Sequence, residues 1–385
     1  MPDGSQPVTL RPLNGIDAID AAAWDACAGT ANPFVCHAFF KALEDSQSAV
    51  AKAGWTPHHL VAESDAGVVL GCLPLYIKSH SYGEYVFDWS WAEALQRAGG
   101  RYYPKFLAAV PFTPVTGPRF LVRPGAPDDT IDTLIGGMIH LAEQSSLSSL
   151  HVNFCTEPEW KRLGAAGLLL RIGKQFHWDN RGYGSFDDFL ADLSSRKRKA
   201  LRKERRGVAE AGVELQSLTG SAIEERHLDA FFEFYMDTSG RKWGHPYLTR
   251  EFFSLLAQSM ADRMLLVIAE KDGRAVGGAL NLIGTEAVFG RYWGCREEYK
   301  FLHFEACYYR AIDYAIAHGI PRVEAGAGGR HKLQRGYLAR PTYSAHWIGH
   351  GGFRDAVGRF LAEERRAVEA EIADCARETP FRKED

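Results

Sequence analysis

The chain lacks the features that would place it in a membrane, outside the cell or around a metal. No stretch approaches the roughly 20 apolar residues of a membrane-spanning helix, and Met1 to Leu10 carries an aspartate and two prolines instead of a signal peptide. Its seven cysteines are scattered, odd in number and without a C-x-x-C pair, which predicts reduced thiols and no zinc site. We therefore expect a cytoplasmic protein without a membrane span.

Missing motifs also exclude several enzyme classes. The chain has no P-loop, no G-x-S-x-G elbow and no H-E-x-x-H pair, so nothing favours a kinase, a hydrolase or a metalloenzyme. Its formal net charge is only -3, so any site for a polyanion must be a local patch, and DNA binding is not expected.

An internal repeat organises what is present. The 385 residues, 46% of them hydrophobic, suffice for two globular domains. Residues 60–75 and 267–282 share seven of 16 positions at an offset of 207, and each copy has the strand, polar turn and strand of a hairpin. This repeat predicts a duplicated chain with one half in residues 1–185 and the other in residues 186–385.

The pattern of elements predicts the fold class. In the second half we expect strands at 264–270, 275–283, 287–294, 322–325 and 342–348, a helix at 303–318 that stops at Gly319, and a charged helix at 353–375. In the first half we expect helices near 16–28, 37–53 and 129–144, a loop at 102–118, and strands at 149–154 and 168–177. Strands interrupted by helices indicate an α/β protein with a mixed sheet in each half.

The segment from Ser194 to Arg206 is the most unusual in composition. Eight of the eleven residues from Arg196 to Arg206 are basic. On a helix, Arg198, Arg202, Arg205 and Arg206 are predicted to share one side, with Lys199 and Lys203 beside them. Because like charges one turn apart destabilise a helix, the run favours a phosphate-binding role over a solvated face.

Several stretches carry a family resemblance. Residues 193–203 resemble the basic helix of Fem-type and related GNAT acyltransferases. The chain also resembles the FemAB-like family of bacterial proteins linked to peptidoglycan biosynthesis or recognition, in residues 78–88, 99–105, 110–118, 175–178, 241–244, 290–295, 303–309 and 331–337. The resemblance runs from Asn32 to about Arg365 and implies a tandem GNAT-like fold with acyl or aminoacyl transfer.

The sequence departs from these relatives at two places. The family usually has Gln and Glu before its His-Lys pair, where this chain has Gly328 and Arg330. GNAT enzymes that use acetyl-CoA usually carry a glycine-containing motif before the helix that follows the third strand. Residues 296–303 contain no glycine and two acids instead, so pyrophosphate binding at that helix is not expected.

Candidate catalytic residues gather in the second half. Transfer to an amine needs a base for the amine, a dipole for the oxyanion and an acid for the leaving group. Glu324 at a strand end, Glu305 at a helix start and His331 are candidate bases, and Tyr337 is a candidate acid. The alternatives are a strand-end ion pair for Glu324, a helix-dipole contact for Glu305 and a structural hydrogen bond for His331.

Donor and acceptor residues are predicted from their neighbours. Backbone N–H groups approach phosphate readily at glycines. An anion cradle is therefore predicted from Gly326, Gly328, Gly329, Lys332 and Arg335, together with Arg198, Lys199, Arg202 and Lys203 of the basic helix. Candidate acceptor residues are Lys242, Trp243, Arg291, Trp293 and His303. The alternatives are an ordinary turn with solvated charges and an aromatic strand face in the core.

Three functional hypotheses stay open. The first is an N-acyltransferase whose donor, acyl-CoA or another phosphorylated acyl carrier, is a substrate and not a tightly bound cofactor. Its acceptor would be a small-molecule or peptide amine. The second is a Fem-like ligase that takes an aminoacyl group from tRNA to a cell-wall precursor or peptide. The third is a non-catalytic GNAT-fold binding module.

Overall fold

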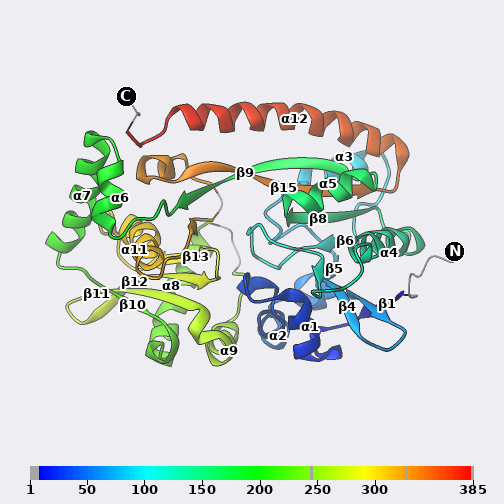
Figure 1. Ribbon diagram of the computed structural model, residues 1–385, viewed down its shortest axis with the longest axis horizontal. Helices are drawn as coiled ribbons and strands as arrows, with labels where there is room; N and C mark the ends of the chain where they lie inside the picture. The colour runs from blue at the N-terminus through cyan, green and yellow to red at the C-terminus, as the bar shows by residue number, and fades with distance from the viewer. Residues whose placement is uncertain (1–7, 243–245, 327, 383–385) are drawn as a thin grey trace. The chain divides into compact units, whose positions relative to one another are not determined.

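The chain folds into two compact units. The computed structural model describes residues 8–242, 246–326 and 328–382, with the side chains of 239–242 excepted. Unit 1 consists of residues 1–173 and 342–369, and unit 2 of residues 174–341 and 370–385. The units thus differ from the predicted halves, because 174–185 belong to unit 2 and 342–369 to unit 1. Strand β9 (Leu169–Asp179), strand β15 (Leu338–Ile348) and helix α12 (Gly351–Arg377) each start in one unit and end in the other (Figure 1).

Unit 1 contains a mixed sheet and a smaller antiparallel sheet. The mixed sheet has the order β2 (Trp55–Pro57), β5 (Leu75–Lys78), β6 (Lys105–Ala108), β8 (Ser149–Cys155), followed by residues 342–348 of β15. The smaller sheet has the order β1 (Val8–Leu13), β3 (His59–Ser64), β4 (Val69–Leu73), β7 (Leu121–Val122). Its helices are α1 (Ala21–Ala28), α2 (His37–Asp45), α3 (Trp89–Arg97), α4 (Thr130–Gln144) and α5 (Glu157–Ala165). Strand β6 lies inside the stretch that was predicted to be a loop.

Unit 2 contains one mixed sheet. Its order is β10 (Glu214–Leu218), β11 (Met264–Lys271), β12 (Arg274–Ile283), β13 (Val288–Cys295), β14 (Arg322–Glu324), followed by the end of β9. Only the β13–β14 pair is parallel. The helices are α6 (Phe186–Asp192), α7 (Ser195–Glu210), α8 (Glu225–Lys242), α9 (Arg250–Met260), α10 (Leu302–Phe304) and α11 (Arg310–Ala317). A π-helical turn (Glu305–Tyr309) joins α10 to α11, and the 3-10 turn η7 (Arg330–Arg335) precedes β15.

Local sequence accounts for several helix ends. Helix α5 begins with a capping box, in which the Thr156 side chain and Glu159 satisfy each other's backbone N–H groups. Helix α9 begins at Thr249, whose hydroxyl accepts a hydrogen bond from the third following amide. The predicted stop at Gly319 is confirmed, since its φ of 64° suits glycine best.

Both copies of the predicted repeat form hairpins. β3 pairs with β4, and β11 with β12, in antiparallel register. The register of the first hairpin shifts between Ala62 and Glu63, and that of the second between Ala269 and Glu270. These are aligned positions of the repeat, so the duplication extends to a shared irregularity of the backbone. Among the described residues, no helix is long and apolar enough to span a bilayer.

Candidate active site

In the unit 2 sheet, the short strand β14 ends before its neighbour β13 does. Strands β13 and β14 pair at Val288–Val323 and Phe289–Glu324, after which β14 stops while β13 continues to Cys295. Just beyond, the register between β12 and β13 shifts, so that Arg291 is the extra residue of a bulge. Bulges of this kind redirect side chains next to functional sites. Glu324 therefore lies at the end of β14, close to an irregular part of β13.

Glu324 faces a histidine across the neighbouring strand. It pairs in register with His177 of β9, and its Oε2 lies 3.7 Å from His177 Nε2. Its other oxygen accepts a hydrogen bond of 2.9 Å from Arg322 Nε. Within the described part of the chain, neither Glu324 Oε2 nor His177 Nε2 has a hydrogen-bond partner. Two unsatisfied polar atoms thus face each other at a buried position.

Burial sets the protonation of this pair. It raises the pKa of Glu324 to about 7, against the opposing effect of Arg322. Burial, helped by the cations Arg322, Arg340 and Lys332, lowers the pKa of His177 to about 3. At neutral pH the imidazole is therefore neutral, while the carboxyl is poised between its two forms. A carboxyl with its pKa near the working pH is suited to general acid–base chemistry.

Lys332 ties the η7 turn to the end of β14. Its buried ammonium group donates to the carbonyls of Ala325 at 2.8 Å and Gly326 at 3.0 Å. Burial lowers the pKa of Lys332 to about 8. The predicted cradle glycines Gly326, Gly328 and Gly329 all have a positive φ. The lysine contacts loop carbonyls in this arrangement, so it holds the loop in shape.

The guanidinium of Arg335, like the ammonium of Lys332, is bonded to other groups of the protein. Its guanidinium donates to Glu204 of α7 at 3.1 and 2.8 Å and to the carbonyl of His331 at 2.8 Å, and it lies 3.3 Å from the centre of the Phe304 ring. The residue is buried. The geometry thus gives Arg335 a bracing role between η7, α7 and α10, where the sequence predicted an anion contact.

Three predicted site residues from separate segments meet in one cluster. The ring centre of His303 lies 5.4 Å from that of Trp293 and 6.3 Å from that of His331. His331 is exposed, and its Nε2 is 2.9 Å from the hydroxyl of Tyr308. Burial, Arg335 and Lys332 lower the pKa of His331, so its imidazole is neutral at physiological pH. The predicted acceptor roles of Trp293 and His303 and the predicted catalytic role of His331 stay predictions.

Two of the predicted catalytic residues occupy structural positions. Glu305 is buried and accepts from Arg205 Nε at 3.1 Å and Nη2 at 2.9 Å, with Arg310 Nε at 3.2 Å. Tyr337 is fully buried, which raises the pKa of its hydroxyl well above the usual range. This geometry fits Glu305 as the centre of a group of ion pairs better than as a base, and Tyr337 as a core residue better than as an acid.

The remaining acceptor candidates are only partly placed. Arg291 is half-buried, with its guanidinium carbon 5.0 Å from the centre of the neighbouring Tyr292 ring. Lys242 ends α8, but its side chain lies outside the described residues, as does Trp243 altogether. Among the described residues, no three histidine, cysteine or acidic side chains are grouped so that they could hold a metal ion.

The basic segment forms helix α7, which has two distinct faces. On the inner face Leu201 and Val208 are buried, and Arg205 pairs with Glu305 and Asp313. Arg198 is half-buried and donates to the carbonyl of Leu193. The four arginines lie within about 100° of one another on the helix, as predicted, but Arg198 and Arg205 are half-buried at the edge of the inner face while Arg202 and Arg206 are exposed. The helix turns Arg205 toward the carboxylates of Asp313 in α11 and Glu305 in the π-helical turn.

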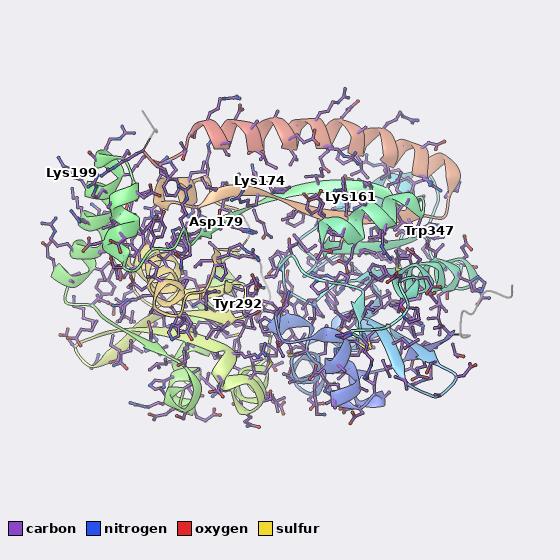
Figure 2. All side chains as sticks on the ribbon, viewed as in Figure 1. Lys161, Lys174, Asp179, Lys199, Tyr292 and Trp347 are labelled. Carbon is purple, nitrogen blue, oxygen red and sulfur yellow. The ribbon has the colours of Figure 1, made fainter. Side chains whose placement is uncertain are left out.

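The outer face of α7 carries a cationic stripe. Its exposed members are Arg196, Lys199, Arg202, Lys203 and Arg206. At 3.6 residues per turn these five span about 120° of the helix surface and about 15 Å of its length. Figure 2 labels Lys199 on this helix. Asp187 pairs with Arg202 at 2.9 Å, in an ion pair whose side chains are both more than half exposed. The stripe is a compact positive surface on a protein of negative net charge.

Sequence reasoning missed His177, and it left Arg196 and Arg206 out of the predicted donor-binding residues. His177 lies in a predicted strand, but only the pairing of β9 with β14 brings it opposite Glu324. Arg196 and Arg206 were part of the basic run, and the burial of Leu201 and Val208 identifies them as outward-facing. A helical wheel centred on these two apolar residues would have found the stripe.

Comparisons with known proteins agree with this architecture. The sequence model of a FemAB-like family, described as peptidoglycan biosynthesis/recognition, matches residues 15–383. The crystal structure of FemX is similar, with a TM-score of 0.56, 12% identity, and coverage of 88% of this chain and 98% of that one. L-PGS from Bacillus licheniformis is similar with a TM-score of 0.51 and 10% identity over 83% and 95% of the two chains.

A third similar structure is the C-terminal domain of a putative lysylphosphatidylglycerol synthetase from Agrobacterium fabrum. It has a TM-score of 0.50 and 10% identity over 84% of this chain and 96% of that one. No curated protein sequence matches the chain. The likeness to FemX establishes the fold, and the predicted α/β architecture with a mixed sheet in each of two units is confirmed.

Proposed function

The chain belongs to the FemAB-like family, and we propose that it transfers an acyl or aminoacyl group from a polyanionic carrier to an amine, with Glu324 as the general base. The observation that carries this proposal is the buried Glu324, with its pKa raised to about 7, at the last pair of the β13–β14 ladder. Family membership supports a role in building or recognising peptidoglycan, so the amine would belong to a cell-wall precursor or peptide.

The chemistry requires an uncharged amine. Deprotonating a lysine-like amine at pH 7 costs about 4.6 kcal/mol, whereas an α-amine costs about 1 kcal/mol. In the proposed step the amine nitrogen forms a bond to the acyl carbon, its proton passes to Glu324 Oε2, and the bond from the acyl carbon to the carrier oxygen breaks. The leaving oxygen then takes up that proton from Glu324, directly or through water, which returns Glu324 to the carboxylate. Arg322 holds the other carboxylate oxygen, which orients the base.

The carrier is best matched by RNA. A stripe of five exposed cations along about 15 Å suits several consecutive phosphates of an extended polyanion. The segment where CoA-dependent relatives bind pyrophosphate instead contains Glu297 and Glu298, and α10 begins after the bulky Phe301 in a left-handed conformation. These features favour an aminoacyl-tRNA donor over acyl-CoA, the donor that the first sequence-based hypothesis named.

The stripe is tested by removing charge. The variant K199A/K203A/R206A should weaken tRNA binding and lower the slope of log K against log salt by about 2 to 3, because each lost phosphate contact removes about 0.7 to 0.9 from that slope. Filter binding between 50 and 200 mM salt measures it. The matched control R97A/K161A/R377A removes three exposed cations elsewhere and should bind as the wild type does.

Turnover tests the reaction itself. Wild-type protein is incubated with charged tRNAs or acyl-CoAs and with cell-wall peptide amines, and amide formation is followed by mass spectrometry. Transfer from aminoacyl-tRNA is expected, and E324Q should reduce it at least 100-fold. Transfer from acyl-CoA alone would refute the RNA carrier. Absence of transfer from every donor, or full activity in E324Q, would overturn the proposed chemistry.

A further inference from the structure

Unit 1 displays an unusual cluster of exposed aromatic rings. Four of the six large hydrophobic side chains exposed in the described chain are aromatic residues of this unit: Tyr82 at 55%, Phe87 at 58%, Trp89 at 39% and Phe360 at 44%. Three of them, Tyr82, Phe87 and Trp89, lie within eight residues, in the loop before α3 and at the first residue of that helix. The rings of Tyr82 and Trp89 are 4.8 Å apart, and His80 lies 5.1 Å from Tyr82. The loop therefore presents neighbouring rings on its surface.

A buried ionic network fixes this loop from below. The ammonium group of Lys105, which is fully buried, donates to Ser81 Oγ and Glu84 Oε2 at 2.8 Å each and to the carboxylate of Asp88. Lys78, also fully buried, donates to the carbonyl of Tyr82 at 3.3 Å. Each of these contacts ends on residues 81–88, so the network immobilises the backbone that carries the rings.

The network has no evident value for stability alone. Buried ion pairs lose much of their attraction to desolvation, and apolar substitutes are often at least as stable. The loop backbone is strained at Tyr85, which has a φ angle of 59°, and Phe112, whose amide donates to the Gly83 carbonyl, has a φ angle of 57°. A Cβ on Gly83 would lie 2.5 Å from a ring carbon of Phe112. Buried charges and strain that together hold exposed rings in place are typical of a preorganised binding site.

The chemistry of the loop favours an uncharged, polar ligand. Residues 79–89 contain no lysine, arginine, leucine, isoleucine or methionine, and the carboxylates of Glu84 and Asp88 are buried. Burial and the nearby Lys78 lower the pKa of His80, so the platform is neutral at physiological pH. A surface for anionic lipids would need exposed cations and aliphatic side chains. Aromatic rings with polar edges instead stack on the C–H faces of sugars while their O–H and N–H groups bond hydroxyls.

We propose that Tyr82 and Trp89, with His80 beside Tyr82 and the exposed Phe87 two residues before Trp89, form a binding platform for an uncharged saccharide in unit 1. The two adjacent rings offer stacking surfaces for sugar units, and the imidazole of His80 offers a hydrogen bond to a hydroxyl group. All of these residues belong to unit 1, and the platform involves neither the base Glu324 nor the α7 stripe. Its failure would leave the proposed transfer untouched.

Titration calorimetry with the full chain tests the platform. The probes are chitotetraose, cellotetraose and maltotetraose. The wild type is expected to bind at least one of them with a millimolar or lower Kd, and Y82A and W89A should each raise that Kd at least tenfold. Y82F, which keeps the ring, should stay within about threefold of the wild type. Thermal unfolding of each variant should match that of the wild type, because the replaced side chains are exposed.

Two further variants separate the platform from general effects. V68A removes another exposed hydrophobic side chain of unit 1, at 44% exposure, and should leave saccharide binding unchanged. S81A removes a ligand of Lys105 without touching the rings, and should weaken binding by loosening the loop. The proposal is overturned if none of the three saccharides binds at 10 mM, or if W89A binds as the wild type does. Trp89-dependent sedimentation with phosphatidylcholine–phosphatidylglycerol vesicles and no saccharide binding would also overturn it.

Discussion

The protonation of Glu324 is decided by two opposing effects on one side chain. Burial disfavours the carboxylate, while Arg322, bonded at 2.9 Å, favours it. Burial is the larger effect, and the pKa rises to about 7. His177 across the strand does not counteract this, because its own pKa falls to about 3 and it carries no charge at neutral pH. The site therefore holds a base that is half-ionised under physiological conditions.

Glu324 makes stability and activity respond to pH in opposite directions. Because its pKa is higher in the folded chain than in the unfolded one, the folded state binds the proton more tightly, and stability falls as pH rises through about 7. The shift corresponds to about 3 kcal/mol. Urea unfolding at pH 5 and pH 8 should show a larger loss in wild type than in E324Q. Meanwhile kcat/KM of the wild type should rise through pH 7. Parallel losses of stability in the two proteins would contradict this assignment.

At the scale of the element, α7 is organised by charge more than by apolarity. Only Leu201 and Val208 are buried, and the helix is fixed by ion pairs of Glu204 with Arg335 and of Arg205 with Glu305. These inner pairs leave the outer cations exposed. A single run of basic residues thus serves two purposes, one structural and one that the proposed function assigns to RNA.

Strand β13 and helix α8 depend on a glycine for their close contact. A Cβ at Gly294 would lie 2.1 Å from the backbone oxygen of Phe234, which cannot move like a flexible side chain. G294A is therefore expected to lower the free energy of unfolding by about 3 kcal/mol. Chemical denaturation measures it. The control G136A, in helix α4 with open space around its Cβ, should instead stabilise by about 0.5 to 1 kcal/mol.

At the scale of the whole molecule, each unit is assembled from two separate stretches of chain. Residues 342–348 of β15 pair with β8, from Tyr343 opposite Cys155 to Ile348 opposite Ser149, and every residue of β8 is buried. The sheet of unit 1 is therefore extended by a strand segment from late in the sequence, residues 342–348, which pairs with β8. A boundary at residue 185, as predicted from the sequence, would separate residues 342–369 from the rest of unit 1.

A fragment of residues 1–185 should consequently fail to fold cooperatively. It lacks the β15 partner of β8 and residues 351–369 of α12. Thermal melts by near-ultraviolet circular dichroism should show no cooperative transition. A chain that joins residues 1–173 to 342–369 through a glycine–serine linker contains the whole of unit 1 and should melt cooperatively. A cooperative melt of the shorter fragment would contradict the division into these units.

Sequence patterns by themselves determined the local elements. The hairpins of the repeat, the helix at the basic run and the glycine stop at Gly319 follow from periodicity, turn residues and φ preferences, which act over a few neighbouring residues. The resemblance of many short motifs also indicated the tandem fold. Glu324 could be named as a candidate because a polar residue at a strand end next to glycines is visible in the sequence.

Tertiary structure decided what these residues contact. The pairing of β9 with β14 sets His177 opposite Glu324, and the packing of α7 turns Arg205 inward and Lys199 outward. In the folded chain, Lys332 donates hydrogen bonds to the carbonyls of Ala325 and Gly326, and Arg335 forms an ion pair with Glu204. Such contacts join residues up to more than a hundred positions apart. They depend on strand register and on burial. Both are determined only when segments that are distant in the sequence pack together and their charged groups pair.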